Sequence, residues 1–165
     1  MKLNTIVFAA SLTFVSAGVM ASTYEKVEFD QIVQQSDTAV VAKKISSSQI
    51  KKNGAIYTQT KFEIIDSGFG FNEKEIIVET MGGSLNHMKY TVSQAGSNSI
   101  LFLKNQPVLL MLNKNNDGSY QLTQAQQGLY PINKNQVMLP ANKGGVVSIE
   151  DAIELVRNIQ AAPKD

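Results

Sequence analysis

The sequence has no cysteine and no tryptophan, and its 165 residues include a single histidine, His87. A chain without cysteine forms no disulfide and has no thiol nucleophile. One histidine leaves few ways to build a nucleophile and base pair, and the G-x-S-x-G nucleophile elbow is absent. A closed structural zinc site, which needs three or four His, Cys or carboxylate ligands, is excluded by the same inventory. We therefore expect no catalytic, cofactor-binding or metal-binding residues.

An excess of positive charge is also lacking. The 15 Lys and Arg residues, less Lys2 in the leader described below, equal the 14 Asp and Glu residues. The only basic concentrations are the pairs Lys43-Lys44 and Lys51-Lys52. Lysines on an exposed strand edge prevent pairing with other chains, which accounts for both pairs. Since binding to a phosphate backbone requires clustered basic residues, the charge pattern argues against a nucleic-acid partner.

One long apolar run is present, at residues 6–15, and it follows the positive Lys2 and precedes small residues. This order is typical of a secretory signal peptide, and the run is shorter than the roughly 20 residues that span a bilayer. We expect cleavage after Ala21, making residues 1–21 the signal, or alternatively after Gly18. Without a cysteine there is no lipid attachment, so the mature chain is expected in the periplasm or outside the cell without a membrane anchor.

The clearest fold signal is a hairpin over residues 38–65 that turns at Asn53-Gly54. This dipeptide suits a type I′ turn, because both central residues need positive φ. After the turn, apolar and polar residues alternate with the period of a half-buried strand. A first strand is predicted at residues 38–45, and further strands are predicted at residues 75–81, 87–92, 99–103, 107–112, 120–123, 128–132 and 137–139.

Two helices frame these strands. Residues 24–36 place Phe29, Ile32 and Val33 at helical spacing, with acidic residues early in the segment. Residues 148–160 begin with Ser148, a favourable N-cap, and carry an apolar face. Loops are expected at residues 66–72, at Gly82-Gly83 and at residues 93–98, and a tight turn is expected at Asp117-Gly118.

Short strands with turns between them, and no helix in the middle of the chain, exclude a parallel α/β fold. We predict that residues 22–165 form a single mainly β domain, a small OB-like antiparallel barrel with a helix at each end. The predicted core consists of Val41, Ile56, Phe62, Ile64, Ile76, Val78, Leu101, Leu103, Val108, Leu110, Leu122, Ile153 and Val156.

Paired carboxylates are the remaining source of catalytic chemistry. Glu75 and Glu79 fall on one face of the strand at residues 75–81, where exposed acidic side chains are ordinary. Residues 115–118 lack the ligand spacing of a calcium loop. Residues 68–70 lack the following helix of a phosphate-binding loop. These segments are therefore interpreted as solvated strand, turn and loop.

Several short motifs carry a resemblance to known proteins: FDQIVQQSDTAVVAKKISS, IYTQTKFEII, VETMGG, ILFLKNQPVLLML and LTQAQQGLYPI. Together they cover residues 29–132 and resemble a mostly uncharacterised family of exported bacterial proteins. The opening is also similar to the netrin-like modules of tissue metalloproteinase inhibitors, which are OB-type barrels. This chain has AGSNSILF where the bacterial family has Gly-x-Pro-x-Phe, and Ser22 where the inhibitors have a zinc-binding N-terminal cysteine.

We therefore expect an exported, non-catalytic binding module with a protein partner, and the resemblance implies an exported protease as that partner. The expected contact edge joins the new chain start to the loops at residues 68–71 and 82–86. Its candidate residues are Ser22, Tyr24, Phe69, Phe71, Leu85 and Asn86. Further candidate aromatics are Tyr57, Tyr90 and Tyr130. The alternative is a periplasmic hydrolase that uses carboxylates.

Overall fold

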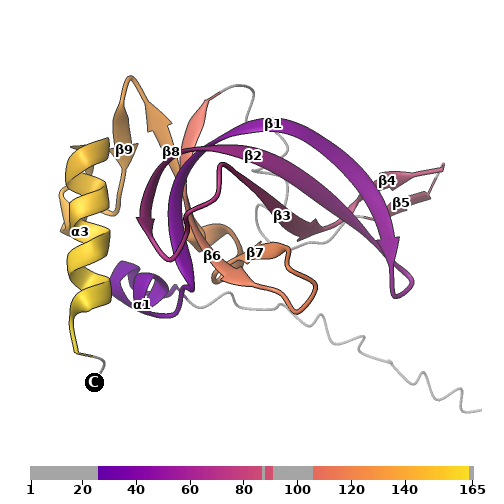
Figure 1. Cartoon of the computed structure of the whole chain (residues 1–165), viewed down its shortest axis with the longest axis horizontal. Helices are drawn as coiled ribbons and strands as arrows, with labels where there is room; N and C mark the ends of the chain where they lie inside the picture. The colour runs from indigo at the N-terminus through magenta and orange to yellow at the C-terminus, as the bar shows by residue number, and fades with distance from the viewer. Residues whose placement is uncertain (1–25, 87, 91–105, 164–165) are drawn as a thin grey trace, which may run out of the picture.

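A computed structural model describes residues 26–86, 88–90 and 106–163 (Figure 1). In these ranges the protein is mainly β, as predicted, with an eight-stranded sheet, a separate two-stranded sheet and two α-helices. The expected signal peptide, the candidate residues Ser22 and Tyr24, and the strand predicted at residues 99–103 lie outside the described residues.

The β1–β2 hairpin forms as predicted but is longer. β1 is Thr38–Lys52 and β2 is Ala55–Phe69, and the turn residues Asn53 and Gly54 have φ of 50° and 80°. The first strand was predicted to end at residue 45, because the polar segment that follows shows no alternation. It continues because its backbone pairs with β2 up to Lys52 opposite Ala55. Figure 1 shows the two strands curving together, with their turn far from both helices.

The loop predicted at residues 66–72 is wrong over its first half. β2 runs through Phe69, which pairs with Ala39, and Ser67 pairs with Val40 at the start of β1. The backbone leaves the strand at Gly70, where φ is 70°. Pairing with an available neighbouring strand thus overrides the turn propensity of Asp, Ser and Gly in this segment.

Five strands close into a ring, in the order β1-β2-β3-β7-β6 and back to β1. The added elements are β3 (Glu75–Met81), β6 (Pro107–Lys114) and β7 (Tyr120–Leu122). All pairings in the ring are antiparallel except β3 with β7, which pair in parallel at Val78 and Tyr120. Closure comes from β1 and β6, which pair from Thr38–Leu112 to Lys43–Pro107.

The other strands extend from this ring. β8 (Leu129–Asn133) pairs with β6, and β9 (Gln136–Met138) and β10 (Val146–Ser148) follow it in the sheet. β4 (Gly83–Leu85) and β5 (Met88–Tyr90) form the separate hairpin. β3 therefore ends before Gly82-Gly83, as predicted, but Gly83 begins a new strand because it pairs with Tyr90.

Two hydrophobic clusters stabilise the fold, one inside the ring and one between the sheet and the helices. β1 contributes Val40 and Ala42 to the first cluster, and Ala39 and Val41 to the second. β6 alternates in the same way, which confirms that this apolar strand is buried on both faces. Of the predicted core residues, Leu101 and Leu103 lie outside the described residues and Ile64 and Leu122 are half-buried. The buried ones are Val41, Ile56, Phe62, Ile76, Val78, Val108, Leu110, Ile153 and Val156.

The helices pack together at one end of the ring, opposite the β4–β5 hairpin (Figure 1). α1 is Phe29–Gln34, shorter than predicted, and α3 is Ile149–Ala161. Ser148 caps α3 as predicted, since its hydroxyl accepts a hydrogen bond of 3.0 Å from the Asp151 amide. Two 3-10 turns, η1 (Ala125–Gly128) and η2 (Ala141–Lys143), complete the elements. No helix in the described part of the chain has the length and apolar character to cross a membrane.

Candidate functional site

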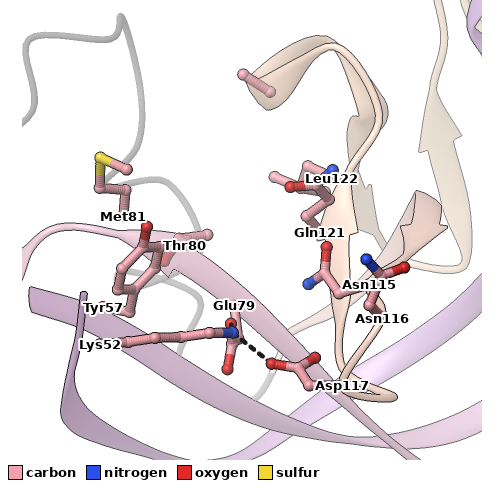
Figure 2. A pocket seen from close by; sticks show the side chains of 11 residues that line it. Lys52, Tyr57, Glu79, Thr80, Met81, Asn115, Asn116, Asp117, Gln121 and Leu122 are labelled. Atoms are coloured by element: carbon pink, nitrogen blue, oxygen red, sulfur yellow. Dashed lines mark hydrogen bonds and ion pairs between the residues drawn. The ribbon is translucent and has the colours of Figure 1, made fainter. Parts of the chain in front are cut away.

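A pocket of about 660 Å³ opens where β3 and β7 separate beyond their single pairing at Val78 and Tyr120. Its two remaining borders are the end of the β1–β2 hairpin and the β6–β7 turn at residues 115–118. Figure 2 shows side chains from these elements facing one another across the space. The lining residues are Lys52, Tyr57, Glu79, Thr80, Met81, Asn115, Asn116, Asp117, Gln121, Leu122 and Ala125.

Glu79 lies at the base of the pocket and is only 7% exposed. The expectation that Glu75 and Glu79 share a solvated face is confirmed for Glu75, which is exposed, and wrong for Glu79. The Gln59 amide donates a 2.8 Å hydrogen bond to Glu79 Oε1, and Lys52 Nζ lies 3.1 Å from Oε2. A carboxylate is buried at this depth only when it is paired and hydrogen-bonded, and both conditions are met.

Lys52 connects three elements through its ammonium group. It pairs with Glu79 of β3 and with Asp117 of the β6–β7 turn, and its Nζ lies 6.0 Å from the ring centroid of Tyr57 on β2. Lys52 was expected to be a solvated edge lysine, and its side chain is 38% exposed, but the sequence did not predict that a distant turn brings a second carboxylate to it. The hydrogen bonds that Lys52 donates to Asp117, and then to Glu79, raise the pKa of Lys52.

The β6–β7 turn holds Asp117 in place for this contact. Gly118 has φ of 86° and its amide donates to the Asn115 carbonyl, so the tight turn predicted here is confirmed. Asp117 Oδ1 accepts hydrogen bonds from the amide and hydroxyl of Ser119, at 3.1 and 2.6 Å. The Lys52 ammonium, followed by these bonds from Ser119, holds the pKa of Asp117 well below its usual range.

The walls of the pocket combine apolar surface with uncharged polar groups. Tyr57 and Met81 lie on one side, and Gln121 and Leu122 lie on the other (Figure 2). The Tyr57 hydroxyl and the side-chain amides of Asn116 and Gln121 have no hydrogen-bond partner within the described ranges. Such groups are available to a bound molecule, because each can exchange a solvent hydrogen bond for one to a ligand.

The backbone beside the pocket is strained. Gln124 and Ala125 have φ of 50° and 53°, in the left-handed region that residues with a Cβ rarely adopt. Ala125 lines the pocket and opens the η1 turn. Backbone strain of this kind clusters at functional sites, where the surrounding structure maintains it.

The candidate contact aromatics Phe69 and Phe71 belong to the hydrophobic clusters rather than to an exposed loop. Phe69 is half-buried in β2 and packs against the cluster beneath the helices. Phe71 is 7% exposed, lies in the ring cluster and makes an edge contact with Tyr120, with ring centroids 5.7 Å apart. Neither ring presents a large free surface to a partner.

Leu85 ends β4, and Asn86 follows it in the turn of the β4–β5 hairpin, where it is exposed with φ of 47°. The hydrogen bond from the Gly82 amide to the Ile56 carbonyl fixes this hairpin near the start of β2. Phe69 ends the same strand, up to about 43 Å further along at the usual strand rise. The two loops expected to share one contact edge are therefore separated by the length of the hairpin.

The three further aromatic candidates also have different positions. Tyr130 is buried against Phe29, with ring centroids 5.2 Å apart, and burial raises its pKa. The Tyr90 side chain lies outside what the structure describes. Of the two candidates whose side chains the structure describes, Tyr57 reaches the pocket. The other pocket residues were missed because they meet only when two turns, more than 60 residues apart in the sequence, come together at β3.

The described residues contain no group of three or more His, Asp or Glu side chains placed to hold a metal ion. What the pocket offers chemically is two carboxylates that share one ammonium group, the carboxylate of Glu79 being buried, and several neutral polar groups. A scan against protein-family models and a search of curated proteins both gave no match to this sequence.

Proposed function

We propose that the protein is an exported, non-catalytic binding module with an OB-like barrel, and that the pocket between β3 and β7 is its binding site. Counted in chain order, the five ring strands are β1, β2, β3, β6 and β7. OB-folds are five-stranded barrels that bind ligands on the face of strands two and three, between the loops that join strands one to two and four to five. The pocket occupies the corresponding place in this ring.

The observation that carries the proposal is the convergence of the two hairpin ends on one pocket. The β1–β2 end supplies Lys52 and Tyr57, and the β6–β7 turn supplies Asn116 and Asp117. A pocket of about 660 Å³ falls within the usual range of ligand sites, and unpaired polar groups beside apolar walls are typical of them.

Hydrolysis by carboxylates, the alternative, receives less support from the same geometry. A carboxylate pair that cleaves by acid and base catalysis needs one member protonated near neutral pH. Lys52 does the opposite, since it lowers the pKa of Asp117 and keeps that carboxylate ionised. An ammonium group between two carboxylates therefore favours a binding role.

The protease partner rests on the resemblance to netrin-like inhibitors, and our proposal moves the contact surface away from the edge that this resemblance implies. That edge required the loops at residues 68–71 and 82–86 to lie together. The pocket instead uses elements that Lys52 already connects, through its ion pairs with Glu79 of β3 and Asp117 of the β6–β7 turn.

The test is capture from a periplasmic or culture fraction of a bacterium that exports the protein, with immobilised residues 22–165 as bait. We expect the double variant Tyr57→Ala/Gln121→Ala to lose the captured molecule. Asn86→Gly keeps the positive φ at this position of the predicted edge, and Gln136→Ala changes an exposed residue of β9. Both variants should capture the molecule as the unchanged chain does.

If Asn86→Gly loses the captured molecule while Tyr57→Ala/Gln121→Ala retains it, the pocket is refuted as the binding site. A hydrolase screen of the same proteins tests the alternative. Turnover that disappears in Glu79→Gln would overturn the non-catalytic assignment.

A further inference from the structure

We infer that the pocket binds a short, neutral oligosaccharide, an inference that rests on the proposed binding function and specifies its ligand. Three features of the described residues lead to this class: the charges at the base of the pocket, the unpaired neutral groups above them, and the apolar surfaces on both walls. Each feature excludes or favours a ligand chemistry independently.

The charges disfavour an ionic ligand. Among the described lining residues, Glu79 and Asp117 face the single positive charge of Lys52, so the pocket carries one excess negative charge. An anionic ligand would meet two carboxylates, and the ammonium group that could attract it is already shared between them. A cationic ligand would compete with Lys52 for the carboxylate oxygens that Lys52 already occupies. It would also lie beside the positive charge of Lys52.

The carboxylate oxygens are all engaged within the protein. Gln59 and Lys52 occupy the two oxygens of Glu79, and Ser119 and Lys52 occupy those of Asp117. The groups left for a ligand are neutral: the Tyr57 hydroxyl and the Asn116 and Gln121 amides. Each of these both donates and accepts hydrogen bonds, which matches the hydroxyl groups of a sugar.

The apolar surfaces select among neutral ligands. The Tyr57 ring and Met81 face Leu122 across the opening (Figure 2). A sugar ring has a face of C–H groups and an edge of hydroxyls, so it can place the face against Tyr57 and the edge against the amides. Tyrosine is suited to this contact because its ring is a large, rigid apolar surface with a polar end. The volume of about 660 Å³ leaves space for a short saccharide.

The experiment is calorimetric titration of residues 22–165 with five defined probes at one salt concentration. Three probes are neutral, namely cellotetraose, maltotetraose and tetra-N-acetylchitotetraose. A heparin tetrasaccharide is the anionic probe and tetralysine is the cationic one. We expect measurable binding of at least one neutral probe, and weaker or no binding of the two charged probes.

Variants then place the bound sugar. Tyr57→Ala is expected to weaken binding about tenfold or more, because it removes the central apolar contact. Tyr57→Phe keeps the ring and should lose about fivefold, the equivalent of one hydrogen bond. Gln121→Ala should also lose about fivefold. Gln136→Ala, on β9 at the other end of the molecule, is the matched control and should bind like the unchanged chain.

Three results would overturn the inference: no binding of any neutral probe, tighter binding of heparin or tetralysine, or neutral binding that is unaffected by Tyr57→Ala and Gln121→Ala. Failure of this inference is distinguishable from failure of the proposed function. If Tyr57→Ala/Gln121→Ala abolishes capture from the extract while all neutral probes fail, the pocket is a binding site for another ligand class.

Discussion

At Gly70 the backbone turns out of β2 with φ of 70°, directly against the carbonyl oxygen of Asp37. A Cβ at this position would lie 2.3 Å from that oxygen, so both the conformation and the space require glycine. The two effects can be separated, because Gly118 has φ of 86° with nothing within 4 Å of its hypothetical Cβ.

We predict that Gly118→Ala lowers the free energy of unfolding by about 1–2 kcal/mol, the cost of a left-handed alanine. Gly70→Ala should cost about 1–3 kcal/mol more, because the neighbouring backbone must also move. Chemical denaturation of the two variants measures the difference. Equal losses would show that the close approach to Asp37 does not constrain this turn.

Single residues also show where sequence reasoning works and where it stops. Strand alternation placed Phe62 and Val78 in the core, a continuous apolar run placed Val108 there, and all three are buried. The same alternation assigned Glu79 to a solvated face, and it is buried instead. Alternation gives the side of the strand on which a residue lies, but not what a distant turn places over that side.

Among the elements, the two hairpin ends depend on Lys52 for their position at β3. The ammonium group pairs with Glu79 on β3 and with Asp117 on the turn, so its removal leaves a buried carboxylate with one partner fewer. Lys51 is its matched control, as it lies next in the same strand and is exposed.

We predict that Lys52→Met lowers the thermal unfolding midpoint clearly, whereas Lys51→Met leaves it within about 1 °C, as for an ordinary surface change. The effect should depend on pH in a defined direction. Asp117 has a lowered pKa in the folded chain, so its stabilisation is present above its unfolded pKa of about 3.9 and is lost as the pH falls through the folded value.

Lys52 has a raised pKa, so its contribution is present below its unfolded pKa of about 10.4 and is lost as the pH rises through the folded value. The difference between Lys52→Met and the unchanged chain should therefore be constant from pH 5 to pH 9 and shrink toward acid. A difference that grows below pH 4 would contradict the ion-pair account.

Element identity was more predictable than element length. Asn53-Gly54 and Asp117-Gly118 were identified as turns because few residues adopt positive φ without strain. β1 and β2 are longer than predicted. The serines after residue 45 extend β1 because they pair with β2, and the segment from Asp66 to Phe69 extends β2 because it pairs with the start of β1. Local sequence does not contain that information.

In the whole molecule, the ring and its helices divide the surface into two ends. α1 and α3 lie at one end, and the β1–β2 turn and β4 lie toward the other (Figure 1). Phe69 packs against the cluster beneath the helices, whereas the pocket is lined by Lys52 and Tyr57 beside the β1–β2 turn. The mainly β class was predictable from the spacing of turns. The candidate site was not, because it depends on β3 and β7 pairing at only one position and then separating.

The most direct test of the binding account is chemical-shift mapping of isotope-labelled residues 22–165 mixed with the molecule captured from the extract. We predict that the largest shifts fall on Lys52, Tyr57, Glu79, Met81, Asn116 and Gln121, and that α3 is unaffected. Largest shifts on Phe69, Phe71, Leu85 and Asn86, or on the exposed face of α3, would contradict the claim that the pocket between β3 and β7 is where this protein binds.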